Sequence, residues 1–318
     1  MGFPVTRAQT GDVVSGTELE FLWLELTNAC NLQCGHCYAE SGPYEGHRDR
    51  LAASDYERIL ASASARGCRS VQFIGGEPTL NKDLPRLIRR AKALGYGFIE
   101  VFSNLVALSD ELRDLFHVHG VRLATSFYSH KAETHDRITK RAGSWQRTSA
   151  NIARAVAVGI PCRAGVIEME ENATDIDATI ALLRQLGIEN VGVDRLRPFG
   201  RGSAGKSPMS SLCGTCAGGV ICVAADGTVS PCIMSKAWAV GNILERDFDD
   251  VMNGAQLRRT RAAIADATVV QNEVPQAGAV RMCNPTCSPC TPGSSCPPTC
   301  SPTNTCYPQN SDGCRPRY

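Results

Sequence analysis

Between Phe21 and Arg195, short apolar runs alternate with longer segments of helical period, and this alternation constrains the fold more than any other feature of the sequence. Chains of this kind form a parallel sheet whose strands are joined by right-handed crossovers. The sequence predicts strands at Phe21–Leu26, Ser70–Ile74, Gly97–Phe102, Val121–Ser126, Pro161–Ile167 and Asn190–Arg195. It predicts helices at Ser54–Ser64, Leu84–Leu94, Ser109–Phe116, Thr148–Val158 and Thr174–Leu186.

Six strand–helix units suit an open or partial TIM-like barrel of the α/β class better than a closed eight-stranded one. In either arrangement the functional groups lie at the carboxyl ends of the strands. Ser109 and Thr174 are plausible N-caps, and a glycine follows three of the helices, at Gly95, Gly159 and Gly187.

The charge balance and the hydropathy exclude several classes of protein. The chain has 33 Lys and Arg against 32 Asp and Glu, with no basic block, so it lacks the electrostatic footprint of a nucleic-acid binder. No apolar stretch approaches the roughly 18–20 residues that cross a bilayer. The N-terminus also lacks a basic segment followed by an apolar one, as in a signal peptide. We therefore expect a cytoplasmic protein that binds neither nucleic acid nor membrane.

The second half of the chain has a different pattern. Arg201–Gly205 has the composition of a linker, and Val220–Val223 and Thr228–Pro231 flank an Asp-Gly turn, which predicts a β-hairpin. A helix is expected over Phe248–Ile264. We expect an N-terminal extension over residues 1–20, an α/β core over 21–205 and a small cysteine-rich domain over 206–318.

Cysteine is the compositional outlier, with 16 residues in 318. Five lie in residues 1–212, four in 213–232 and seven in 283–318. Without an export signal, this load favours metal ligation over disulfides. The tail from Cys283 contains eight prolines and few large apolar residues. It cannot bury enough surface to offset its ordering entropy, so it is disordered or held by covalent or metal bonds.

A cysteine-rich loop directly follows the first predicted strand. Cys30, Cys34 and Cys37 have the spacing C-x3-C-x2-C. Three thiolates can hold three irons of a [4Fe–4S] cluster, which normally takes four cysteines, so the fourth iron stays open to a small-molecule ligand. On the spacing alone, a zinc knuckle or three coincidental thiols remain as alternatives.

A glycine-rich turn ends the second predicted strand, at Gly75-Gly76-Glu77-Pro78. Its glycines allow close backbone approach, and its backbone can hydrogen-bond an ammonium group. Together the loop and the turn resemble the radical S-adenosylmethionine (SAM) superfamily. The resemblance implies that the cysteine loop holds a [4Fe–4S] cluster that binds SAM, that His36 lies beside the cofactor, and that Gly75–Pro78 bind the amino group of SAM.

Further positions are implied by the same resemblance. Ser103 and Asn104 end the third strand, where the family often has residues near the methionine carboxylate or the ribose, and Ser126 ends the fourth strand similarly. His135-Asp136-Arg137 and Gly143-Ser144-Trp145 resemble a stretch that precedes the next helix in many members. Ordinary capping or turn formation explains each of these equally well.

The cysteine pattern after residue 212 resembles the SPASM extension of radical SAM enzymes. Cys216-x10-Gly227-x4-Cys232 is followed by Cys287-x2-Cys290-x5-Cys296-x3-Cys300, and Val240–Ile243 resembles a stretch between the two groups. The resemblance implies two auxiliary [4Fe–4S] clusters. The first would use Cys216, Cys222, Cys232 and Cys300, and the second Cys287, Cys290, Cys296 and Cys314, with Cys306 as the alternative to Cys314. Cys213 and Cys283 are left over and either could replace one of these ligands. All-cysteine zinc sites and a disulfide-linked tail are the competing interpretations.

The resemblance implies that the protein reductively cleaves SAM to methionine and a 5′-deoxyadenosyl radical, which abstracts a substrate hydrogen. An electron donor such as a flavodoxin or ferredoxin is implied as a partner. Many SPASM members modify ribosomally made peptides by crosslinks, thioethers or epimerisation, and this is the leading interpretation. The alternative is an epimerase or dehydrogenase of an aminosugar or antibiotic precursor.

Two features bear on the substrate. About 20 residues precede the first strand, so we expect peptide capture to need a separate leader-binding protein. Ile233 follows Cys232 where sulfatase-maturing relatives have a catalytic aspartate, which argues against formylglycine formation. The catalytic residues are unknown, and an epimerase would need a hydrogen donor, for which Cys213, Cys283 and Cys306 are candidates.

Overall fold

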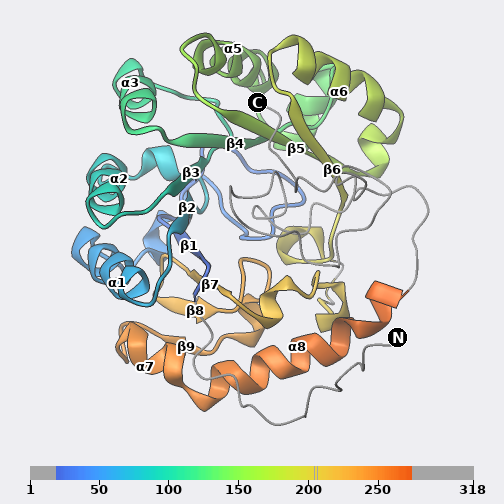
Figure 1. The fold of residues 1–318 in the computed structure, drawn as a ribbon. Helices are drawn as coiled ribbons and strands as arrows, with labels where there is room; N and C mark the ends of the chain where they lie inside the picture. The colour runs from blue at the N-terminus through green and yellow to red at the C-terminus, as the bar shows by residue number, and fades with distance from the viewer. Residues whose placement is uncertain (1–18, 204, 206, 274–318) are drawn as a thin grey trace, which may run out of the picture.

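The computed structural model describes residues 19–203, 205 and 207–273. These residues form one nine-stranded sheet in the order β6-β5-β4-β3-β2-β1-β7-β8-β9 (Figure 1). Its first six strands in chain order pair in parallel. They are β1 (Phe21–Glu25), β2 (Ser70–Ile74), β3 (Phe98–Phe102), β4 (Arg122–Ser126), β5 (Cys162–Glu168) and β6 (Asn190–Arg195).

Helices cover the outer side of this curved parallel sheet (Figure 1). They are α1 (Ala53–Ala65), α2 (Leu84–Ala93), α3 (Asp110–His119), α4 (Ala132–Thr139), α5 (Ser144–Ala157) and α6 (Ile176–Gln185). The partial α/β barrel predicted from the alternation is thereby confirmed, and every predicted strand lies within two residues of its observed bounds.

The two faces of the sheet are buried against different partners. Leu22, Leu24 and Phe73 are fully buried in the large apolar cluster that includes residues of α1 and α2. Alternate residues, among them Phe21 and Trp23, belong to a second cluster with side chains from the later part of the chain. Because strand residues alternate between faces, β1 contributes to both layers.

The second part of the described chain extends the same sheet. β7 (Val220–Val223) pairs in parallel with β1, and β8 (Thr228–Ser230) and β9 (Gly241–Asn242) follow in antiparallel order. The predicted hairpin is confirmed. Short 3-10 helices lie at Glu45–Arg48, Pro78–Leu80, Glu170–Asp175, Gly200–Gly202, Met209–Ser211, Thr215–Ala217 and Lys236–Trp238.

Two local predictions about helices were wrong, and one helix was missed. The single helix expected over Phe248–Ile264 is divided into α7 (Phe248–Asn253) and α8 (Ala255–Glu273), because Gly254 has extended backbone angles and ends α7. Helix α4 was not predicted. Thr174 is not an N-cap, since α6 begins only after the 3-10 helix that ends at Asp175.

The other residues predicted to begin or end helices were correct. The Ser109 side chain accepts a hydrogen bond from the Leu112 backbone amide at 3.2 Å, as expected of an N-cap. Gly95, Gly159 and Gly187 have φ angles of +81°, +79° and +88°, which favour glycine after a helix.

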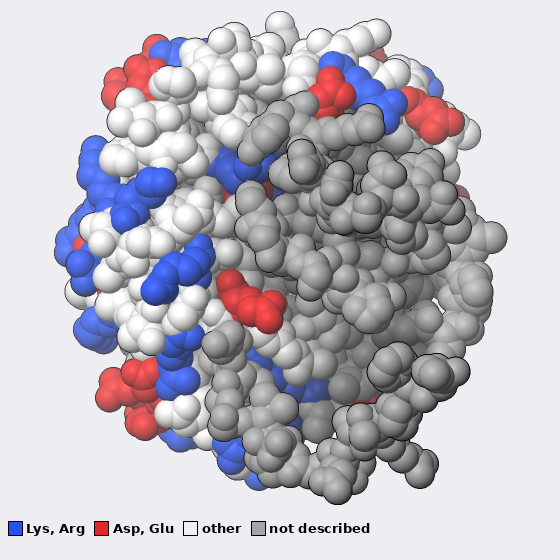
Figure 2. Space-filling model, viewed as in Figure 1, with Lys and Arg blue, Asp and Glu red and all other residues white. Residues whose placement is uncertain are grey.

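Charged side chains lie in local patches of opposite sign rather than evenly. Lys and Arg gather along the edge formed by α1, α2 and α3 (Figure 2), where α2 exposes Arg86, Arg89, Arg90 and Lys92.

None of the helices that the structure describes has both the length and the hydropathy to cross a membrane.

Candidate functional site

The cysteine loop after β1 lies directly against the glycine-rich turn after β2. The Gly76 amide donates to the Thr27 carbonyl at 2.7 Å, and the Glu77 amide donates to the Ala29 carbonyl at 2.8 Å. A Cβ atom on Gly76 would lie 2.2 Å from the Ala29 carbonyl oxygen. Only a glycine therefore allows this approach, which brings the two sequence motifs together.

Asp49 holds the start of the cysteine loop. Its carboxylate accepts hydrogen bonds from the Thr27 hydroxyl at 2.5 Å and from the Asn28 backbone amide at 2.7 Å. The Asn28 side chain donates to the same carboxylate at 2.8 Å. Asp49 was not among the predicted site residues, because it is distant from the loop in sequence and follows no recognisable motif.

The residues that end β3 contact both motifs. The Asn104 side-chain amide donates to the Cys30 sulfur at 3.6 Å and to the Asn31 side chain at 2.6 Å. The buried Glu77 carboxylate accepts from the Ser103 hydroxyl and the Asn104 backbone amide, both at 2.8 Å. It also accepts from Thr79. The Glu77 and Ser103 side chains thus bond each other and orient the strand ends.

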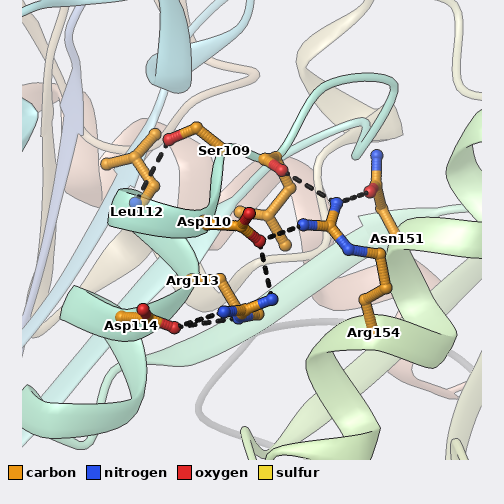
Figure 3. Close-up of polar contacts among 8 residues, drawn as sticks. Ser109, Asp110, Leu112, Arg113, Asp114, Asn151 and Arg154 are labelled. Carbon is orange, nitrogen blue, oxygen red and sulfur yellow. Dashed lines mark hydrogen bonds and ion pairs between the residues drawn. The ribbon is translucent and has the colours of Figure 1, made fainter.

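Helix α5 supports the segment that follows Asn104. Thr148 and Asn151 donate to the backbone carbonyls of Asn104 and Leu105 at 2.9 and 2.8 Å. One turn further along, Arg154 donates to the Leu108 carbonyl and pairs with Asp110 of α3 (Figure 3). Residues at helical spacing thereby fix the β3–α3 connection and, through it, Asn104.

The chain returns to the cysteine loop after β6. The Arg201 amide donates to the Cys37 carbonyl at 3.0 Å, and its guanidinium donates to the Cys34 carbonyl at 2.9 Å. A Cβ on Gly200 would lie 2.4 Å from the Tyr38 carbonyl oxygen. The prediction of a plain linker was therefore wrong for Arg201 and Gly202, which form part of a 3-10 helix. The flanking glycines, Gly200 and Gly202, were the available signal.

Cys30 is buried, and Cys34 and Cys37 are half-buried. Burial, together with the charge of Cys37, raises the pKa of Cys30 and of Cys34 to about 12. Such thiols stay protonated at neutral pH unless a metal displaces the proton. No three His, Cys, Asp or Glu side chains in the described ranges converge on one ion position. Three cysteine thiols on one loop are a donor set that fits three irons of a [4Fe–4S] cluster.

His36 lies between the cysteines and the end of β4. Its Nε2 is 3.1 Å from the Tyr128 hydroxyl, and the two rings meet edge to face with centroids 4.8 Å apart. Its Nδ1 is buried and has no hydrogen-bond partner. The Tyr128 hydroxyl also bonds Ser126. The structure thus brings together His36 and Ser126, and leaves one polar atom of this group unpaired.

Buried His135 predicts a pH dependence of stability. Burial lowers its pKa to about 4, against roughly 6.5 in the unfolded chain, and its Nδ1 accepts from the Tyr128 amide. The unfolded state therefore binds more protons between these values, and stability falls as pH drops from about 6.5 to about 4. We expect His135 to account for about 2–3 kcal/mol of that loss. Urea unfolding at several pH values gives the free energy of unfolding as a function of pH. This free energy should change less with pH in His135→Asn than in the wild type. His117→Asn, on the surface of α3, should show the wild-type pH dependence.

A second group of cysteines lies on the inner side of β7 and in the segments beside it. Cys216, Cys222 and Cys232 are buried in one apolar cluster with Phe21 and Trp23 of β1. The remaining predicted ligands and hydrogen-donor candidates, Cys283, Cys287, Cys290, Cys296, Cys300, Cys306 and Cys314, lie outside the described residues. No disulfide is present among the described cysteines.

Tyr38 lies between the two cysteine groups. Its ring packs against the cluster that contains Cys222, and its hydroxyl donates to Glu25 at 3.4 Å. Glu25 is paired at 2.5 Å with Lys236, which is only 30% exposed. Cys68 and Cys162 lie at the opposite, amino-terminal ends of β2 and β5, away from both groups.

Comparisons with known proteins agree with both motifs. A family model described as the radical SAM superfamily matches residues 24–183, and one described as an iron–sulfur cluster-binding domain (SPASM) matches residues 213–291. A probable GTP 3′,8-cyclase of Saccharolobus islandicus is 30% identical over 188 residues, which are 59% of this chain and 60% of the relative. The sporulation killing factor maturation protein SkfB of Bacillus subtilis is 28% identical over 184 residues, covering 57% of this chain and 44% of SkfB.

The fold also resembles that of a solved structure. SuiB of Streptococcus suis, crystallised with its precursor peptide SuiA, aligns with a TM-score of 0.63 at 17% identity over 76% of this chain and 66% of SuiB. The chain thus spans less than two thirds of the length of these relatives.

Proposed function

Because the chain belongs to the radical SAM superfamily, we propose that it cleaves SAM reductively at the cysteine loop and uses the resulting radical to modify a ribosomally made peptide. The observation that carries this proposal is the contact between the loop of Cys30, Cys34 and Cys37 and the turn at Gly76. We assign residues 21–205 to the SAM-binding core, 206–318 to an auxiliary cluster domain and 1–20 to an extension.

The proposed site assigns a task to each residue group. Cys30, Cys34 and Cys37 would hold a [4Fe–4S] cluster, which when bound supplies one electron to SAM and releases methionine and a 5′-deoxyadenosyl radical. The backbone of Gly75–Pro78 would bind the amino group of SAM, and Asn104 its carboxylate or ribose. His36, fixed against Tyr128, would pack beside the cofactor, and Glu77 and Ser103 would keep the strand ends in position.

The neighbouring side chains would also limit side reactions. Cys30 is 8% exposed, with Leu32 and Val106 packed beside it, and these apolar side chains would limit the access of water to this part of the loop. The Arg201 guanidinium binds the Cys34 and Ser41 carbonyls, and this closes the loop from the side of β6. A radical formed here would be held until a substrate hydrogen is within reach.

A peptide substrate is supported by two relatives. SuiB was solved with a precursor peptide, and SkfB is named as a maturation protein. The second candidate is a small-molecule substrate, which the probable GTP 3′,8-cyclases favour. An electron donor of the flavodoxin or ferredoxin class and a separate leader-binding protein remain proposed partners.

The test is SAM cleavage by the full chain, reconstituted with iron and sulfide and reduced with dithionite without oxygen. We expect 5′-deoxyadenosine from the wild type, and from Cys37→Ala only as much as in a protein-free control. Cys162→Ala, which removes a half-buried thiol at the other end of the sheet, should retain wild-type cleavage. Equal cleavage by Cys37→Ala and wild type would refute the proposal.

The substrate class is tested separately. Candidate precursor peptides and small molecules, each fully deuterated at carbon, are incubated with SAM and the reduced protein. Deuterium in 5′-deoxyadenosine from the peptides alone supports the peptide assignment. Deuterium transfer from a nucleotide or aminosugar alone would replace it with the second candidate.

A further inference from the structure

We propose that Cys213 is a ligand of the first auxiliary cluster, completing a four-cysteine set with Cys216, Cys222 and Cys232 in place of Cys300. The inference rests on the iron–sulfur part of the proposed function. It assigns the cluster entirely to residues 213–232, whereas the resemblance implied a fourth ligand in the tail.

The first support is contact between the thiols. The Cys216 thiol is hydrogen-bonded to the thiols of both Cys213 and Cys232. Cys213 also bonds the Thr215 hydroxyl at 3.5 Å, which turns its side chain towards its own loop. Cys222, fully buried on β7, interacts electrostatically with Cys232. Four thiols from three segments therefore surround one region of the interior.

The second support is the local backbone. Cys213 and Cys216 are separated by two residues, the spacing of paired ligands in ferredoxins and of Cys34 and Cys37. Gly214 between them has φ +84°, and Thr215–Ala217 form a short 3-10 helix. This turn folds both thiols to the same side of the chain, and a residue with a side chain would be strained at Gly214.

The third support is the charge around the group. Arg261, only 7% exposed, interacts electrostatically with Cys216 while donating to the Val220 carbonyl. Lys236 lies near Cys222 and is paired with Glu25. A cluster held by four thiolates is anionic, so the positive charge at this place favours it.

Four thiolates are a donor set for a structural zinc ion as well as for a [4Fe–4S] cluster. The family model that matches residues 213–291 describes an iron–sulfur cluster-binding domain, which favours the cluster. As a ligand, Cys213 would no longer serve as the hydrogen donor that the sequence had left open.

The experiment isolates this site within the full chain. Cys30, Cys34 and Cys37 are replaced by alanine, and the seven cysteines from Cys283 onward by serine. After anaerobic reconstitution we expect about four iron and four sulfide per chain, with the electron paramagnetic resonance signal of a reduced [4Fe–4S] cluster. Adding Cys213→Ser should lower iron to about three or fewer and give an oxidised [3Fe–4S] signal, whereas adding Cys162→Ser should change neither value.

Three results would overturn the inference: no cluster in the isolated site, a cluster that Cys213→Ser leaves unchanged, or zinc instead of iron. Should the multiply substituted chain fail to fold by circular dichroism, the comparison moves to single variants of the otherwise intact protein. In these single variants, the Mössbauer spectrum of Cys213→Ser should show one changed cluster and the other clusters unchanged. Cys300→Ser should not show the same change. SAM cleavage needs only the loop of Cys30, Cys34 and Cys37. Failure of the proposed function would therefore appear as missing 5′-deoxyadenosine, and not in the iron content or spectra of the auxiliary site.

Discussion

Arg163→Met is expected to lower the free energy of unfolding by about 3–5 kcal/mol. Arg163 of β5 donates through Nε and Nη2 to the Glu100 carboxylate of β3, at 2.9 and 2.7 Å. Glu100 is fully buried and also accepts from Gln72. Without the guanidinium, the buried Glu100 carboxyl would keep only the Gln72 side-chain amide as its partner. Urea unfolding at pH 7 measures the loss.

Two controls separate the ion pair from a general effect of the substitution. Glu100→Leu combined with Arg163→Met should recover most of the stability, because an apolar pair leaves no uncompensated charge. Arg86→Met removes the bidentate pair with Glu57 on the surface and should hardly move the urea midpoint. If Arg163→Met unfolds at the wild-type midpoint, the buried pair does not stabilise the protein.

Gly76→Ala is expected to displace the cysteine loop and to reduce SAM cleavage by about 10²-fold, the effect of a misplacement of roughly 1 Å. The new Cβ would lie 2.2 Å from the Ala29 oxygen and 2.7 Å from its carbonyl carbon, both backbone atoms. Relief of this overlap must stretch the hydrogen bond from the Glu77 amide to Ala29, which leads directly into Cys30. The loss of stability should be about 1–3 kcal/mol.

Gly97→Ala is the matched control, since a Cβ there meets no atom within 4 Å. The measurements are 5′-deoxyadenosine formation and iron content of the reconstituted proteins. Wild-type values for Gly76→Ala would mean that the close approach of the two motifs does not determine the position of the loop.

The strands were predictable because each is a short run with apolar residues between longer segments of helical period. Helix α4 was missed because its sequence, Ala132–Thr139, carries only one large apolar residue and its N-cap Lys131 makes no side-chain capping bond. Asp175 explains the misplaced start of α6. Its carboxylate binds Ser129 and Lys131, residues distant in sequence, instead of capping a helix.

At the site, the spacing of cysteines and glycines indicated which residues carry the chemistry. It did not indicate which other residues contact them and hold them in position. The proximity of Cys30 to Gly76 follows from adjacent parallel strands, whose ends meet at one edge. The contacts of Arg201 and Asp49 depend on loops whose paths no local pattern encodes. The contact of Cys213 with Cys216 likewise required the packed structure, because the ligand sets implied by the resemblance left Cys213 over.

The pairing of β1 with β7 means that the amino-terminal core is not self-contained. A fragment that ended before Val220 would leave β1 as an unprotected edge, with unpaired backbone amides and carbonyls beside apolar side chains such as Phe21 and Trp23. Edges of this kind recruit strands from other molecules and promote aggregation. By pairing with β1, β7 therefore protects this edge and reduces self-association, in addition to carrying Cys222.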